Sequence, residues 1–178
     1  MNELIFKVQI VKNNSEYEDV SFKSDLLNLN YIFGSAFYVQ HKELQKLLRY
    51  PEDVHPAANK RIVFKHLLSL MSSKLNLLKR DHAVFLPIDM EAEYTGVLKC
   101  ALDSDMQFSI QFGVIDEENV GIDIKTLKPI GNVNKYFTAQ TAKVVCEISE
   151  IQAAIASNLL EINDEAVKLM EEQIPLGS

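Results

Sequence analysis

Four residues of types that can do acid-base or metal chemistry lie around one short apolar stretch. His82 precedes the stretch, and Asp89, Glu91 and Glu93 follow it at alternate positions. An imidazole and carboxylates together can hold a divalent metal ion or act as general acid and base. On an extended strand, however, His82 and Asp89 would lie about 20 Å apart at ~3.3 Å per residue. An enzyme, or a metal or small-ligand site around His82, Asp89 and Glu91, is therefore the alternative hypothesis rather than the favoured one.

Aromatic residues are concentrated in a second stretch, which places Tyr31, Phe33, Phe37 and Tyr38 around Gly34. Aromatic side chains at this density most often fill a core, and they can also line a ligand pocket or a partner-binding groove. These four aromatic residues form the candidate ligand pocket of the sequence.

Motifs of the common enzyme classes are missing from the sequence. It contains no GxGxxG, GxxxxGK(S/T), HExxH, GxSxG or EF-hand pattern, each of which would place a nucleotide, a nucleophile or a metal ion. Cys100 and Cys146 lack the CxxC or Cys/His spacing of a zinc or redox site, and we expect them to be buried free thiols. The sequence thus favours a protein that is not an enzyme and needs no cofactor or metal ion.

Charge is segregated along the chain, whose 178 residues carry a net charge of −7. Residues 41–80 hold nine Lys or Arg against three Asp or Glu, whereas residues 81–178 hold six against 17. An acidic surface can steer and dock a basic protein, and a sequence pI near 5.1 disfavours nucleic acid as a partner. The residues predicted to form this acidic surface are Asp89, Glu91, Glu93, Asp116, Glu117 and Glu118.

The elements that must position these residues follow from the spacing of apolar side chains. Spacings of three and four predict one long amphipathic helix over about 57–80 and another from Ser149. Asn163 is expected to cap a separate short helix over 164–173, and residues 24–50 are expected to be mostly helical. Alternation of apolar and polar residues predicts strands over 3–11, 17–23, 83–88, 96–103, 106–115, 119–125 and 141–148.

The order of these elements predicts a single α+β domain over residues 1–178, with residues 174–178 frayed. Its antiparallel sheet would bury one face against the helices, the long helix 57–80 among them, and turn a mostly polar second face to water or a partner. The apolar runs are far shorter than the ~20 residues needed to span a bilayer, and the N-terminus lacks the pattern of a signal peptide. We therefore expect a cytoplasmic protein without a membrane partner.

The charge pattern and the missing motifs together favour a non-enzymatic protein-binding domain of the inhibitor or toxin-immunity type. Its partner would be a basic protein, such as a toxin or an enzyme, that docks on the acidic surface. A third alternative is a structural subunit that forms a homodimer through the polar sheet face or an edge strand.

Overall fold

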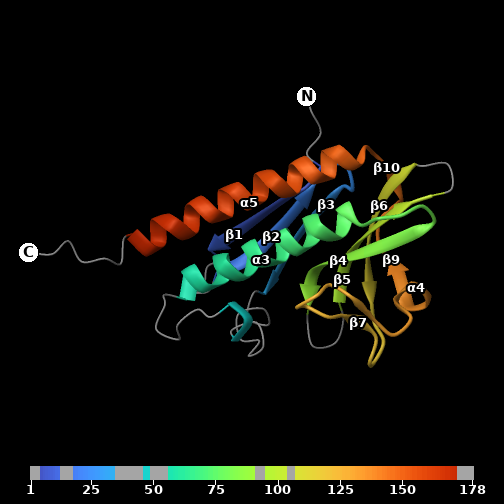
Figure 1. The fold of residues 1–178 in the computed structure, drawn as a ribbon, viewed down its shortest axis with the longest axis horizontal. Helices are drawn as coiled ribbons and strands as arrows, with labels where there is room; N and C mark the ends of the chain where they lie inside the picture. Colours follow the sequence, from blue (N-terminus) through green and yellow to red (C-terminus); the bar gives the residue numbers. More distant parts are fainter. Residues whose placement is uncertain are drawn as a thin grey trace, which may run out of the picture.

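The computed structural model describes residues 5–12, 18–34, 46–48, 56–90, 95–103 and 107–171. Within these ranges the chain forms two antiparallel sheets, a two-stranded ribbon and two long helices. Figure 1 shows the two helices side by side, with strands β1 to β3 behind them and strands β4 to β6 toward one end of the helix pair. This arrangement confirms the predicted α+β fold, in which antiparallel sheet packs on helices.

The first sheet is an antiparallel meander of three strands in the order β1 (Lys7–Lys12), β2 (Glu18–Ser24) and β3 (Leu29–Gly34). Its register places Val8 opposite Phe22, and Phe22 opposite Tyr31. Because side chains alternate between the two faces of a strand, apolar residues of all three strands share one face. That face is buried against the helices.

The prediction that residues 24–50 are mostly helical is wrong for the residues that form β3. Ser24 Oγ does accept a hydrogen bond from Leu27 N at 3.2 Å, as the cap of a helix would. The turn ends at Asn28, however, whose φ of +49° lies in the left-handed region and cannot continue a right-handed helix. The chain then pairs with β2 along the whole of β3. Residues 46–48 are helical, and the rest of 35–50 lies outside the described residues.

The second sheet contains, in order, β10 (Val144–Val145), β6 (Phe108–Ile115), β5 (Thr95–Leu102) and β4 (His82–Met90), and β9 (Phe137–Ala139) also pairs with β6. The predicted meander of β4, β5 and β6 is confirmed. The strand predicted over 119–125 shrinks to β7 (Gly121–Ile122), which pairs with β8 (Pro129–Ile130) in the separate ribbon. The strand predicted over 141–148 shrinks to β10, and α5 begins at Ile148, the last residue of the predicted strand.

The two long helices are α3 (Pro56–Asn76) and α5 (Ile148–Glu171). Side-chain contacts at both ends show that they run antiparallel. At one end Arg61 Nε lies 2.9 Å from Glu165 Oε2, and at the other Gln152 Nε2 donates a hydrogen bond to Asn76 Oδ1 at 2.8 Å. Neither helix in the described part of the chain has the length and apolar character needed to cross a membrane.

Both helices differ from the sequence prediction at one end. Helix α3 stops at Asn76 rather than near residue 80. Leu77 N and Leu78 N donate to carbonyls three residues back, each at 3.1 Å, and bonds of this spacing form a tighter turn than the four-residue spacing of an α-helix. Helix α5 continues without a break through Asn163, so the separate helix predicted after this residue is wrong. Asn163 Oδ1 instead accepts a hydrogen bond from Lys65 Nζ of α3 at 2.6 Å.

The core lies between the helix pair and the two sheets. Phe33 of β3 and Phe64 of α3 meet there with ring centroids 6.5 Å apart. Asn158 of α5 is buried in the same region, where it accepts a hydrogen bond from Val8 N at 2.8 Å and donates one to Phe6 O at 3.4 Å. This side chain therefore ties α5 to the backbone of β1. The buried apolar residues of the helices are Val63, Phe64, Leu67, Leu68, Met71, Leu75, Ile151, Ile155 and Ile162.

The second face of the larger sheet is covered in part, so the expectation that this face meets water or a partner is wrong for the covered part. Phe137, which follows the short helix α4 (Val133–Tyr136), lies over Gly113, where an added Cβ would come within 2.5 Å of the ring. Lys99 Nζ lies 5.2 Å from the ring centroid of Phe137 and 5.6 Å from that of Phe85, distances that allow cation–π attraction to both rings.

Candidate functional site

Two residues predicted to belong to separate sites meet in the interior. Tyr31 Oη of β3 donates a hydrogen bond to Asp89 Oδ2 of β4 at 3.0 Å. The Tyr31 ring lies 5.8 Å from that of Phe112, centroid to centroid. Gly96 sits opposite Asp89 in the register, and a Cβ there would lie 3.2 Å from Asp89 Cβ and 3.5 Å from the Phe112 ring. Because Gly96 has no side chain, the Asp89 side chain and the Phe112 ring both have room beside it.

Asp89 is consequently not part of an exposed acidic surface, and that prediction is wrong for this residue. Its side chain is only 1% exposed. A carboxylate buried to this degree needs hydrogen-bond donors, and Tyr31 supplies one. Phe33 is likewise buried, stacked on Tyr31 at 6.2 Å, so both described members of the aromatic cluster contribute to the core; Phe37 and Tyr38 lie outside the described residues.

The alternative site around His82, Asp89 and Glu91 does not come together among the described residues. His82 is exposed at the first position of β4 and pairs with Leu102, whereas Asp89 is buried near the other end of the strand. Glu91 and Glu93 lie outside the described residues. In the part of the chain that the structure describes, no three His, Cys, Asp or Glu side chains gather closely enough to hold a metal ion.

The remaining predicted acids are Asp116, Glu117 and Glu118, and all three are exposed in the connection between β6 and β7. We call this segment the acidic turn. Its backbone is held by a hydrogen bond from Val120 N to Glu117 O at 3.2 Å, and Asn119 adopts a φ of +63°. None of the three carboxylates forms an ion pair with a residue in the described ranges.

The strand register fixes where the acidic turn lies on the sheet. Met90 pairs with Thr95, and Thr95 pairs with Ile115. These three residues therefore lie in the last row of the sheet at one end, and the acidic turn follows directly after Ile115. Ile115 is 1% exposed and also pairs with Phe137, so the turn is anchored on a buried strand end.

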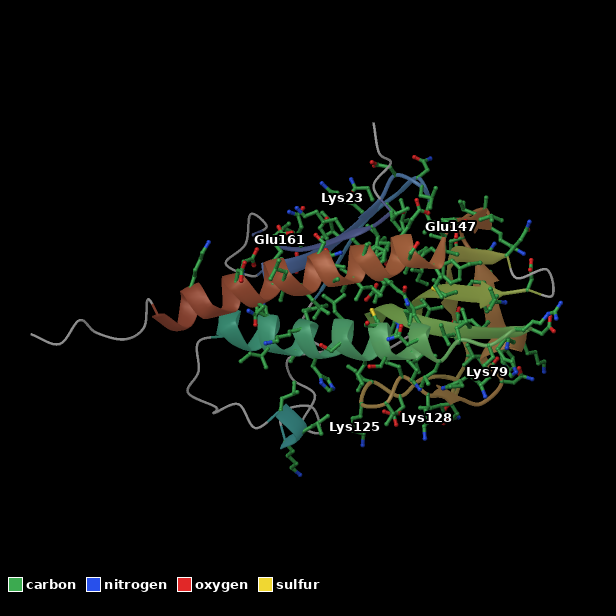
Figure 2. The ribbon with its side chains drawn as sticks, turned by 45° about the horizontal axis from the view of Figure 1, so that its top comes forward. Lys23, Lys79, Lys125, Lys128, Glu147 and Glu161 are labelled. Atoms are coloured by element: carbon green, nitrogen blue, oxygen red, sulfur yellow. The ribbon has the colours of Figure 1, made fainter. Side chains whose placement is uncertain are left out.

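A cleft of about 350 Å³ lies between the C-terminal part of α3, the start of β4 and the segment from β7 to α4. We call it the Lys74 cleft, because Lys74 is the charged residue of its lining. Figure 2 shows Lys125 and Lys128 pointing outward beneath α3, on the side away from α5, where the β7–β8 ribbon lies. The other residues that line the cleft are Ala83, Val84, Phe85, Ile122, Leu127, Pro129, Gly131, Asn132, Val133 and Asn134.

The ribbon that closes this cleft is held in a fixed shape by local hydrogen bonds. Asp123 N donates to Lys128 O at 2.9 Å, and Leu127 N donates to Asp123 O at 2.7 Å. Leu127 and Gly131 both have positive φ, +50° and +70°; at Gly131 a side chain would also meet Val120 at 3.0 Å. No pattern in the sequence marks this cleft, since its walls come from segments that are far apart along the chain.

Burial changes the proton affinity of two kinds of side chain. It raises the pKa of Cys100, and it raises the pKa of Cys146 to about 11 with added contributions from the Glu150 and Glu147 carboxylates. Both cysteines are free, and Cys100 is buried as predicted while Cys146 is half-buried. Burial also lowers the pKa of His66, whose Nε2 is buried without a hydrogen-bond partner among the described residues.

Comparison with known proteins supplies no relative from which a role could be transferred. No family model, curated protein or solved structure matches the chain. Any role of the acidic turn or the Lys74 cleft therefore rests on the residues of this chain alone.

Proposed function

We propose that the protein is a non-enzymatic binding domain that docks a basic protein partner, of the toxin or enzyme kind, through its acidic turn. The observation that carries the proposal is the exposure of three consecutive carboxylates, Asp116, Glu117 and Glu118, without an ion pair to the described residues. Neighbouring like charges repel one another. A cationic surface placed against the turn would relieve that repulsion, which favours the complex.

Net charge and anchoring both support this role. The chain carries −7 overall, so a basic partner is attracted over distances of about a Debye length, ~8 Å at physiological salt. The buried strand end at Ile115 holds the base of the turn in place. Docking would then need little ordering of the turn, and less of the interaction free energy would be lost to entropy.

The test compares two triple variants that remove the same number of charges. Asp116→Asn, Glu117→Gln and Glu118→Gln neutralise the acidic turn, whereas Asp81→Asn, Glu147→Gln and Asp164→Asn neutralise three exposed acids elsewhere. The probe is a fluorescent oligolysine peptide, whose association rate is followed by stopped flow at increasing NaCl. We expect the first triple to weaken binding about tenfold at low salt and to flatten the salt dependence. The control triple should change the binding and its salt dependence much less.

Equal losses in the two triples would show that only net charge matters and would contradict docking at the turn. For a protein partner from the native host, the association rate constant should fall steeply as salt is raised. A rate indifferent to salt would remove the electrostatic basis of the proposal.

A further inference from the structure

We propose that the Lys74 cleft binds a small organic anion, namely a carboxylate joined to an apolar body such as a short alkyl chain or a single aromatic ring. The site uses none of the residues of the acidic turn, so it stands independently of the proposed protein docking.

The size and floor of the cleft set the size of the ligand. Its volume of about 350 Å³ is at the lower end of the range for small-molecule sites, roughly 300–1,000 Å³, so it suits one ring or a short chain better than a peptide or a dinucleotide. The floor residues are already packed, with Ile122 and Leu127 each 3% exposed and Val133 2% exposed. A preformed apolar floor favours the apolar part of a ligand without a cost for reorganisation.

The charge of the lining selects an anion. Lys74, half-buried in the last turn of α3, is the charged residue among the described lining residues, and none of them is acidic. Asp123, the acid next to Ile122, uses Oδ1 to accept hydrogen bonds from Lys125 N at 2.7 Å and Thr126 N at 3.3 Å, so its carboxylate is engaged within its own turn. An ammonium beside an apolar floor interacts more strongly with a carboxylate than it would in bulk water.

Two amide side chains can assist Lys74 in holding the carboxylate. Asn132 and Asn134 are exposed and line the cleft beside α4. Asn132 Oδ1 accepts a hydrogen bond from Lys135 N at 3.2 Å, which fixes this side chain and leaves its NH₂ group to donate. Carboxylates accept hydrogen bonds from such groups. One cation, two amides and an apolar floor thus match a ligand with an anionic head and an apolar body.

The experiment titrates the full chain with octanoate and with octanamide, which has the same chain length and no charge. Calorimetry should show octanoate binding about tenfold more tightly than octanamide. Lys74→Gln should remove this preference by weakening octanoate alone, because the apolar floor is unchanged. Lys128→Gln is the matched control, since this lysine points outward (Figure 2), and it should keep the preference.

A second variant tests the location independently of charge. Ala83→Phe places a ring in the lining and should weaken both probes, and amide chemical shifts of Ile122 and Leu127 should move on titration of the unmodified chain. Equal affinity of the unmodified chain for the two probes would overturn the proposal. So would an octanoate preference that survives Lys74→Gln, or shift changes confined to residues outside the cleft.

Discussion

Tyr31 Oη donates a hydrogen bond to Asp89 Oδ2 across 3.0 Å and so joins the sheet of β1 to β3 to the sheet of β4 to β6. The two residues are 58 positions apart, and the carboxylate that accepts the bond is almost fully buried. Removing a donor from a buried acceptor costs more than the bond itself contributes, because the acceptor has already lost its water. Loss of this hydrogen bond should therefore lower the free energy of unfolding.

Tyr31→Phe removes the hydroxyl and keeps the ring on Phe112. We expect the free energy of unfolding, measured by urea titration, to fall by about 1–3 kcal/mol. Tyr136→Phe is the matched control, since the Tyr136 hydroxyl accepts its hydrogen bond from Lys135 Nζ at an exposed site and its loss should cost less than about 0.5 kcal/mol. A loss for Tyr31→Phe no larger than that of the control would show that the contact is not stabilising.

How much of the fold the sequence predicts depends on whether the deciding interactions are local. The alternation over 106–115 and the apolar stripe of α3 repeat within a few residues. A strand forms over Phe108–Ile115 and a helix over Pro56–Asn76, so both predicted elements are present although α3 ends earlier than predicted. Leu26, Leu29 and Phe33 have helical spacing as well, yet Leu29 and Phe33 lie on a strand. Their conformation is decided by pairing with β2, which no short window of sequence contains.

Only part of the candidate site was predictable, because only part of it depends on residues that are close together in the sequence. The exposure of Asp116, Glu117 and Glu118 follows from their polarity in a turn between strands, and the structure places them there. The burial of Asp89 depends on the distant Tyr31, so spacing alone could not reveal it. The Lys74 cleft arises only when the β7–β8 ribbon folds against α3 and β4, and it leaves no motif in the sequence.

Asn158→Ala should loosen the attachment of α5 to β1. The change leaves Val8 N without the acceptor that now lies 2.8 Å away, and an unsatisfied buried N–H costs about 1–3 kcal/mol. Hydrogen exchange at the Val8 amide should accelerate, and the free energy of unfolding should fall by a similar amount. Ser157→Ala, at the adjacent exposed position of α5, is the control; exchange at Val8 that is equally fast in both variants would contradict this role for Asn158.

His66 should make the fold less stable in acid. Burial lowers its pKa in the folded protein, while the unfolded chain keeps the ordinary value of about 6.5. The folded state therefore binds fewer protons, so the stabilising contribution is present above the unfolded pKa and is lost as the pH falls through the lowered one. The loss of unfolding free energy between about pH 7.5 and pH 5 should be smaller in His66→Gln than in the unmodified protein. His82→Gln, at an exposed position, is the control, and identical pH profiles for all three proteins would rule out the effect.

Cys146 should remain a protonated, weakly reactive thiol until the solution is strongly alkaline. Burial, helped by Glu150 and Glu147, raises its pKa to about 11, whereas an unfolded chain has a thiol pKa of about 8.5. Since the folded state holds the proton more tightly over this interval, the fold should also lose stability as the pH rises from the lower value to the upper one.

Alkylation by iodoacetamide, followed at Cys146 by mass spectrometry, measures this thiolate directly. Only the thiolate attacks the reagent, so the rate at pH 8 should be far below that of a free thiol and should rise about tenfold per pH unit toward pH 11. Glu150→Gln keeps the acceptor that now receives the Glu147 N–H at 2.9 Å and removes one nearby charge, so it should raise the rate at pH 8. Glu118→Gln removes a charge from the acidic turn and should leave the rate unchanged, and a rate that levels off below pH 9 would show that the thiol is not perturbed.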